Sequence, residues 1–224
     1  MTFRMTILSY AAIDFRVAAR ALPGQSTSGD LRGVIPRPRA AIVAVADGLG
    51  HGYEAAIAPR VAINTLVASA DLPVLDAVRC CHEALIRTRG VAISVACLKW
   101  SDETLTWLSI GNVAALLLRA DDRGSIQREH VLIRNGVVGH RLPPLRSATH
   151  LIRRRDLLIV ATDGVHERFE MDVRLAAPPQ EIADHISHDM EKFSDDALEL
   201  VADGTGRQQA VRQHDGDVRQ CCFN

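Results

Sequence analysis

The stretch AAIVAVADGLGHG (residues 40–52) joins a short apolar run to an aspartate and a cluster of glycines. The run 40–46 has the length and the β-branched content of a buried strand. Asp47 ends that run, although a lone carboxylate beside an apolar core is costly unless its charge is compensated. LLIVATDG (157–164) repeats the pattern, because it ends at Asp163 and then a glycine. The repeated pattern predicts that strand ends present carboxylates for a shared purpose.

The composition indicates one globular domain and excludes several classes of protein. The chain has 224 residues, 47% of them hydrophobic, which is enough for a large core. A net charge of -1 lacks the strongly basic balance of a nucleic-acid-binding domain. No apolar run reaches the roughly 18 residues of a membrane span, and the N-terminus does not resemble a signal peptide. We therefore expect a cytoplasmic protein without nucleic-acid or membrane partners.

The five cysteines predict neither a disulfide framework nor a metal site. Their number is odd, and four of them form the adjacent pairs Cys80–Cys81 and Cys221–Cys222. Reduced thiols are the expected state in the cytoplasm. Consecutive residues of a helix point about 100° apart, so Cys80, Cys81 and His82 cannot converge on one ion.

Hydrophobic periodicity divides the chain into strands and two blocks of helix, which is typical of the α+β class. A polar loop is expected over residues 21–33, and a hairpin with the Asn-Gly turn of residues 135–136 over 130–139. The other expected strands are a pair within 1–20, then 40–46, 91–100, 104–112, 114–120, 157–161 and 195–202. The expected helices are 53–70 with a weak point at Pro59, 72–89 and 178–193.

Four aspartates lie where predicted strands begin or end. Asp30 precedes a strand, Asp47 and Asp163 each end one, and Asp195 opens the last one. Such carboxylates would repel one another if the fold brought them together. A divalent cation removes the repulsion, because it supplies positive charge and prefers carboxylate oxygens. An ordinary set of Asp-Gly turns is the plainer alternative for a single site, but the repetition favours a metal centre.

Glycines support this interpretation at both of the apolar strand ends. Gly48 and Gly164 directly follow a candidate ligand, and a residue without Cβ lets the backbone turn sharply and approach an ion. Gly50 and Gly52 would open the loop before the following helix. The N-terminus of that helix is expected to attract an anion such as phosphate.

The ordered set SGD, ADGLGHG, IGN, ATDGVHE and DDALELV resembles the PP2C-type metal-dependent protein phosphatases, in the SpoIIE/RsbU/RsbX branch. The stretch CHEALIRTRGVAISVA is most similar to the small, single-domain RsbX-type members. The resemblance spans about residues 10–202. It implies a four-layer αββα sandwich, in which two antiparallel β-sheets are flanked by helices. We expect this domain over residues 1–202 and a flexible tail over 203–224.

The resemblance also implies a site with two Mn²⁺ or Mg²⁺ ions. Asp47 resembles the bridging ligand, and Gly48 would offer its backbone carbonyl. Asp163 and Asp195 resemble ligands of the first ion, with Asp196 as the alternative to Asp195. Asp30 resembles an acidic residue near the second ion. In this family Asp47 and Asp163 would act in catalysis through a metal-bound water that attacks phosphorus in line.

Other polar residues near these motifs have plainer expected roles. Arg20 and Arg32 are close enough in sequence to bind a substrate phosphate, but each is expected to be a solvated arginine. His51 is shifted from the histidine of the eukaryotic relatives, and a catalytic role is the less favoured alternative. Asn112 is expected to be a structural cap at a turn, and Arg153 to Arg155 a solvated basic run.

The sequence therefore predicts a metal-dependent protein serine/threonine phosphatase. The resemblance to the RsbX-type members implies partners that are phosphorylated regulators of bacterial stress signalling, of the STAS type found in stressosomes and anti-sigma pathways. The alternative is a catalytically silent PP2C-like module that only binds a partner. A nucleotide-binding loop at GLGHG is excluded, because Leu49 stands where the D-x-G-x-G of GHKL kinases needs a glycine. The chain also lacks G-K-[ST] and a βαβ context.

Overall fold

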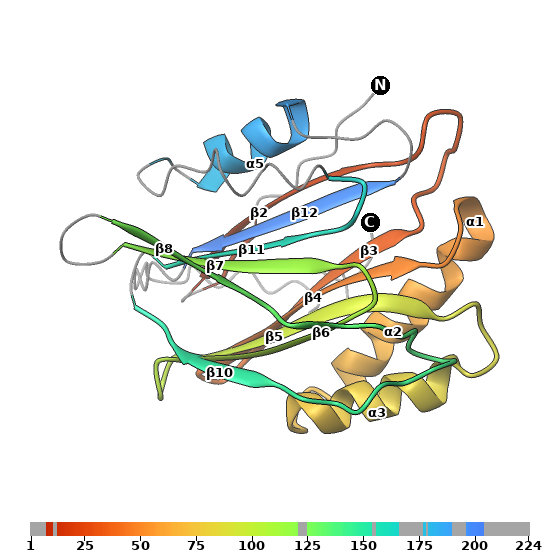
Figure 1. Cartoon of the computed structure of the whole chain (residues 1–224), viewed down its shortest axis with the longest axis horizontal. Coiled ribbons are helices and arrows are strands. Elements are labelled where there is room, and N and C mark those ends of the chain that lie inside the picture. The colour runs from red at the N-terminus through yellow and green to blue at the C-terminus, as the bar shows by residue number, and fades with distance from the viewer. Residues whose placement is uncertain are drawn as a thin grey trace, which may run out of the picture.

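The computed structural model describes residues 8–10, 13–120, 125–153, 156–165, 177, 179–189 and 196–203. Two β-sheets lie face to face, and helices cover the outer face of each sheet (Figure 1). This is the expected four-layer αββα sandwich. The elements follow from a chain whose strands are apolar on one or both faces and whose helices cover the sheets.

The sheet that contains β2, here called the β2 sheet, has the strand order β1-β2-β12-β11-β7-β8, with every pair antiparallel. Its strands are β1 (Leu8–Tyr10), β2 (Ile13–Arg20), β12 (Ala197–Asp203), β11 (Leu157–Ala161), β7 (Ala114–Ala120) and β8 (Ile126–His130). The described helix on its outer face is α5 (Pro179–Asp189).

The second sheet, here called the β4 sheet, has the order β10-β6-β5-β4-β3, and β9 pairs with β6 in parallel. Its strands are β3 (Asp30–Arg37), β4 (Ala40–Gly48), β5 (Val91–Lys99), β6 (Thr104–Ile110), β9 (Ile133–Arg134) and β10 (Ala148–Leu151). The helices α1 (Gly52–Ala55), α2 (Ile57–Ala68) and α3 (Val74–Leu85) cover its outer face (Figure 1).

Strand β4 reads as a continuous apolar run because both of its faces are buried. Val43 and Val45 lie in the core between the sheets, together with Val160 of β11. Ile42 and Ala44 lie in the core between the β4 sheet and its helices. A strand with one solvated face would alternate apolar and polar residues, so the unbroken run 40–46 already indicates a central position.

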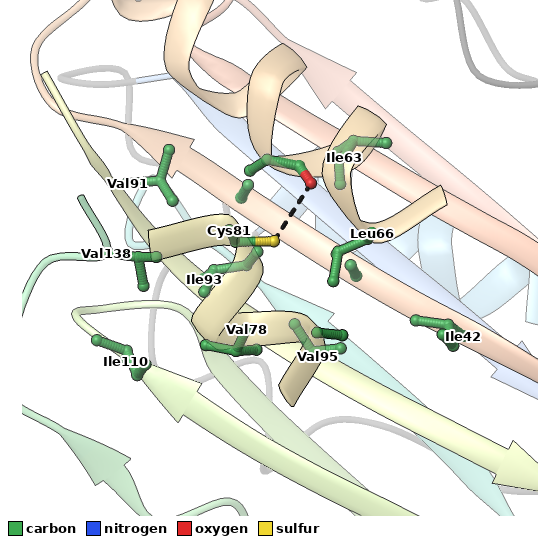
Figure 2. Close-up of a cluster of buried hydrophobic side chains, with 14 of the residues drawn as sticks. Ile42, Ile63, Leu66, Val78, Cys81, Val91, Ile93, Val95, Ile110 and Val138 are labelled. Carbon is green, nitrogen blue, oxygen red and sulfur yellow. Dashed lines mark hydrogen bonds between the residues drawn. The ribbon is translucent and has the colours of Figure 1, made fainter. Parts of the chain in front are cut away.

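The core under α2 and α3 encloses the thiol of Cys81 (Figure 2). The Cys81 side chain is fully buried, and its thiol donates to the carbonyl of Ala62 over 3.5 Å. Burial, and secondarily the neighbouring Cys80, raises the pKa of the Cys81 thiol to about 12. A thiol that stays protonated at neutral pH is neither a nucleophile nor a thiolate ligand.

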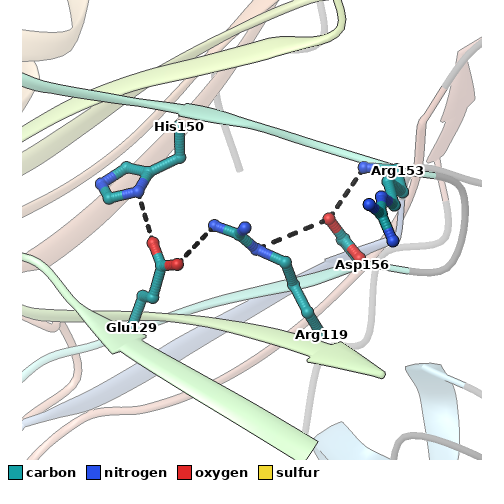
Figure 3. A network of polar contacts seen from close by, with 5 residues as sticks. All are labelled: Arg119, Glu129, His150, Arg153 and Asp156. Carbon is teal, nitrogen blue, oxygen red and sulfur yellow. Dashed lines mark hydrogen bonds and ion pairs between the residues drawn. The ribbon is translucent and has the colours of Figure 1, made fainter. Parts of the chain in front are cut away.

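A polar network joins the two sheets at their β8 and β10 edges (Figure 3). Arg119 of β7 forms an ion pair with Glu129 of β8 over 2.8 Å and a longer one with Asp156 over 3.8 Å. Glu129 also pairs with His150 of β10. The His150 ring lies edge-on against Trp107, with 5.3 Å between ring centroids. The network therefore connects the β8 edge of the β2 sheet to the β10 edge of the β4 sheet.

Asp156 gives this network a pH dependence that can be measured. Burial raises the pKa of its carboxyl above the ordinary 3.8, and the amide of Arg153 and the charge on Arg119 oppose that shift. A raised folded pKa contributes stability that is fully present below the unfolded value and is lost as pH rises through the folded value. We therefore expect Asp156→Asn, which cannot ionise, to gain stability relative to the wild type as pH rises above the ordinary carboxyl pKa of 3.8.

Urea unfolding of both proteins over this pH range checks the expectation. The Arg153 amide lies 2.8 Å from Asp156 Oδ2, and the asparagine carbonyl oxygen still accepts that hydrogen bond. Asp102→Asn in the exposed β5–β6 turn is the control, and its stability should follow the wild type. A wild type that gains stability relative to Asp156→Asn as pH rises would contradict the expectation.

Three sequence predictions about local structure were wrong. Residues 130–139 do not form a hairpin, because β8 pairs with β7 and β9 pairs with β6 of the other sheet. The loop 21–33 ends at Gly29, and Asp30 is already the first residue of β3. The helix break after Gly52 lies at Ala56 and not at Pro59. Pro59 lies in the first turn of α2, where backbone N–H groups have no intrahelical partner.

The expected strand pair within 1–20 is confirmed as β1 and β2. Within the expected tail, Asp203 ends β12, and residues 204–224 lie outside the described residues. None of the described helices is both long and apolar enough to cross a bilayer.

Candidate metal centre

Asp30 and Asp47 face each other across adjacent strands at one end of the sandwich. They are register partners in the antiparallel pair β3–β4, at the start of one strand and near the end of the other. Two residues further along, Arg32 pairs with Val45, which lies in the core between the sheets. Side chains alternate along a strand, so Asp47 and its partner Asp30 also face the space between the sheets. Like charges directly opposite are destabilising, which favours a cation there.

Thr162 connects this pair of aspartates to the β2 sheet. Its hydroxyl donates to Asp30 Oδ2 over 2.8 Å, and it accepts from the amide of Leu198 over 3.0 Å. Both Thr162 and Asp30 are buried, so the hydrogen bond is shielded from water. Thr162 directly precedes Asp163, and it therefore fixes the turn that carries the third candidate ligand.

Asp163 is exposed at the end of β11, and Asn112 holds one of its oxygens. The Asn112 amide donates to Asp163 Oδ2 over 2.6 Å. Asn112 lies in the turn between β6 and β7, and β7 begins beside the end of β11 in the register Ala161–Ala114. Asn112 was expected to be a structural cap, and the structure places it on a candidate ligand. The motif IGN was the only sequence signal for this role. The contact between Asn112 and Asp163 itself depends on strand pairing.

Asp196, the alternative to Asp195 as a ligand, holds the loop before Asp30 through its carboxylate. Its carboxylate is buried and accepts hydrogen bonds from the amides of Leu22 and Gly29, both over 2.6 Å. The Gly29 carbonyl accepts in turn from the amide of Gly48 over 3.1 Å. Asp196 therefore ties the β2 sheet to the loop before Asp30. Asp195, the predicted ligand, lies outside the described residues.

Gly48 and Gly164 are required by close backbone contacts. A Cβ on Gly48 would lie 2.1 Å from the carbonyl oxygen of Ala55, and one on Gly164 would lie 1.8 Å from that of Asp196. Neither distance can be tolerated without a backbone shift. The sequence analysis selected these two glycines for a sharp turn beside an ion, and the structure shows close backbone packing at both. Positive φ angles occur instead at Gly50 (97°) and Gly52 (75°), in the loop that leaves the site.

The structure gives different surroundings to the remaining candidate residues, two arginines and two histidines. Arg20 is buried in β2, and its neighbour Ala19 packs against the core between the sheets, so Arg20 faces the α5 side. Arg32 shares the face of Asp30 and Asp47. His51 is exposed, and α1 behind it has only four residues, too few for a strong anion-binding N-terminus. His82 is structural, because its Nδ1 accepts from the amide of Gly139 over 2.9 Å.

The donor chemistry at this end suits a hard divalent cation. Carboxylate and backbone carbonyl oxygens are the ligands that Mg²⁺ and Mn²⁺ prefer. Within the described ranges, however, no group of three or more His, Cys, Asp or Glu side chains lies close enough to hold an ion. The described residues therefore provide a paired site at Asp30 and Asp47 and a separate carboxylate at Asp163.

Comparison with known proteins identifies the family. The family model of stage II sporulation protein E (SpoIIE) matches residues 37–215. No sequence among curated proteins matches the chain closely enough to count as a relative. The matched range contains β4, β11 and β12, and with them Asp47, Asp163 and the Asp195–Asp196 pair.

Solved structures share this architecture over most of the chain. A chain from the structure described as "The bacterial stressosome: a modular system that has been adapted to control secondary messenger signaling" is 25% identical, with a TM-score of 0.76 over 85% of this chain and 98% of that one. RsbX in complex with magnesium is 20% identical, with a TM-score of 0.81 over 89% and 99%.

The catalytic domain of the serine/threonine protein phosphatase PstP in complex with two manganese ions is 18% identical, with a TM-score of 0.62 over 86% of this chain and 98% of that one. At these two lower identities the likeness shows the fold alone. The matched model and the αββα sandwich together show that the chain is a PP2C-type phosphatase domain and belongs to the SpoIIE family.

Proposed function

We propose that this chain is a Mn²⁺- or Mg²⁺-dependent protein serine/threonine phosphatase. The observation that carries the proposal is the register pair Asp30–Asp47, which a buried hydrogen bond from Thr162 joins to the turn of Asp163. Two facing carboxylates and a third on the opposite sheet repel one another, and a bound cation would offset that repulsion.

The proposed ligands are the carboxylates of Asp30, Asp47, Asp163 and Asp195, and the carbonyl of Gly48. Bound ions would supply an acidified water and would neutralise charge on the phosphoryl oxygens. The structures of RsbX with magnesium and PstP with two manganese ions support the choice of metal and a count of two. Asn112 would orient Asp163, and Thr162 would orient Asp30.

Arg32 is the residue we propose for binding the substrate phosphoryl group. Burial lowers the pKa of its guanidinium, and among the described residues the side chain has no hydrogen-bond or ion-pair partner. It lies two residues from Asp30, roughly 7 Å along the same face of the strand. A guanidinium can reach back over that distance and bind phosphate oxygens in a bidentate manner.

Hydrolysis of p-nitrophenyl phosphate and of a phosphoserine peptide tests the proposed function. We expect activity with Mn²⁺ that EDTA removes. Arg32→Ala should raise KM for both substrates about tenfold, which corresponds to a loss of about 1.4 kcal/mol of binding free energy. Arg32→Lys should restore part of this loss, because it keeps the charge but not the bidentate geometry. Arg60→Ala on the exposed face of α2 is the matched control and should change neither constant. A folded chain that is inactive with every divalent metal would leave the silent binding module as the function.

The proposed substrates are phosphorylated STAS-type regulators of bacterial stress signalling. The match to a chain from a stressosome structure and the match to RsbX support this class of substrate. Dephosphorylation of such regulators would reset the signal. Purified phosphorylated STAS domains, compared with an unrelated phosphoserine protein at equal concentration, test the preference through the ratio of kcat/KM values.

A further inference from the structure

The charged side chains of residues 130–155 are all basic. This segment contains six arginines and three histidines but no aspartate or glutamate, while the whole chain has a net charge of -1. Its arginines are Arg134, Arg141, Arg146, Arg153, Arg154 and Arg155. The charge asymmetry is local, and clustered positive charge attracts anionic partners.

The described part of this segment, residues 130–153, starts at the metal-centre end of the sandwich. The amide of Gly111 donates to the carbonyl of Arg134 over 2.9 Å, and the next residue, Asn112, holds Asp163. The chain then passes over α3 and returns along the β4 sheet as β10 (Figure 1). β10 is the edge strand of that sheet. It begins opposite Trp107, three residues from Ile110, so it starts roughly 10 Å from β9.

The cations of this segment are presented to solvent. Arg141 and Arg146 are exposed, and Arg134 is half-buried. In the described part of the chain, none of these three side chains has an ion-pair or hydrogen-bond partner. Elsewhere on the surface Arg37 and Arg79 each pair with an aspartate. These three arginines therefore keep their positive charge available, whereas His150 of the same segment pairs with Glu129.

Exposed apolar side chains accompany the arginines. Leu132 is 65% exposed and Leu151 is 70% exposed, at the two ends of the segment. Arginines mixed with exposed aliphatic side chains are typical of surfaces that bind proteins. A nucleic-acid surface would need a denser basic field, and the chain as a whole is slightly acidic.

We infer that residues 130–153 form a docking surface for acidic residues that flank the phosphorylated residue of a protein substrate. The inference rests on the proposed function, because it names the class of sequence presented to the same site. A phosphorylated residue at the metal centre would place acidic residues three to six positions away beside Arg141 and Arg146, since an extended chain spans roughly 3.3 Å per residue. The surface would therefore lower KM for acidic substrates and leave kcat unchanged.

The test compares two phosphoserine peptides, one with acidic and one with neutral flanks, on the full chain with Mn²⁺. We expect KM for the acidic peptide to be about tenfold lower at low salt, and the advantage to shrink as ionic strength rises. The double variant Arg141→Gln/Arg146→Gln should remove about fivefold of this advantage, with kcat unchanged and p-nitrophenyl phosphate hydrolysis as in the wild type. Arg60→Gln/Lys99→Gln removes the same charge from exposed positions elsewhere and should change nothing.

Binding of fluorescently labelled peptides in EDTA separates this inference from the proposed function. Preferential binding of the acidic peptide, weakened by the double variant, supports the docking surface even if no hydrolysis occurs. Equal affinity for both peptides, or equal losses in the two double variants, overturns it. Tighter binding of an oligothymidylate than of the acidic peptide, lost in Arg141→Gln/Arg146→Gln, would show a nucleic-acid surface instead and would also overturn it.

Discussion

Asp47→Asn is expected to reduce Mn²⁺-dependent phosphatase activity about a hundredfold or more, because the bound ions supply several kcal/mol of transition-state stabilisation. The variant should remain folded. It removes one of two like charges that face each other across β3 and β4, so its free energy of unfolding in EDTA should rise by about 0.5 kcal/mol. Mn²⁺ should stabilise the wild type against heat and have little effect on the variant.

Asp102→Asn, which removes an exposed carboxylate from the β5–β6 turn, is the control for this experiment. It should keep full activity and the full shift of melting temperature with Mn²⁺. The metal-centre proposal would be wrong if Asp47→Asn kept both properties. Loss of activity with an unchanged Mn²⁺ shift would mean that Asp47 acts on the substrate and that other residues hold the ion.

Gly164→Ala is expected to destabilise the protein by about 3 kcal/mol or more, the cost of overpacking where relaxation requires a backbone shift. The new Cβ would lie 1.8 Å from the carbonyl oxygen of Asp196. The side chain of the same residue accepts hydrogen bonds from the amides of Leu22 and Gly29, so a shift there would disturb both. Activity should be lost together with stability, because Thr162 and Asp163 lie in the same turn. Urea unfolding and turnover of p-nitrophenyl phosphate measure the two effects.

Gly24→Ala separates this steric cost from the cost of glycine-specific backbone geometry. Gly24 has a φ of 90°, but a Cβ there would meet nothing within 4 Å. We therefore expect a loss of about 1–2 kcal/mol from backbone strain alone, with activity retained. Equal losses of unfolding free energy in Gly24→Ala and Gly164→Ala would show that close packing against Asp196 adds no cost of its own.

The sequence by itself determined the central strands and the positions of the aspartates at their ends. The run 40–46 is apolar on both faces, so it could only be a strand buried between two layers. Asp47 and Asp163 follow such runs directly, and a carboxylate in that position requires compensation. These inferences depend on neighbours in the chain, which is why they hold without a structure.

Only the tertiary structure decided which side chains meet. Thr162 bonds to Asp30 across 132 positions of sequence, and Asn112 bonds to Asp163 across 51. Neither contact leaves a local pattern, because strand register and sheet order create it. The same holds for Arg20 and Arg32: both are arginines near the first motif, but the alternation of their strands sends one toward α5 and the other toward the metal centre. Local chemistry therefore identified the candidate ligands, and long-range strand pairing decided what surrounds them.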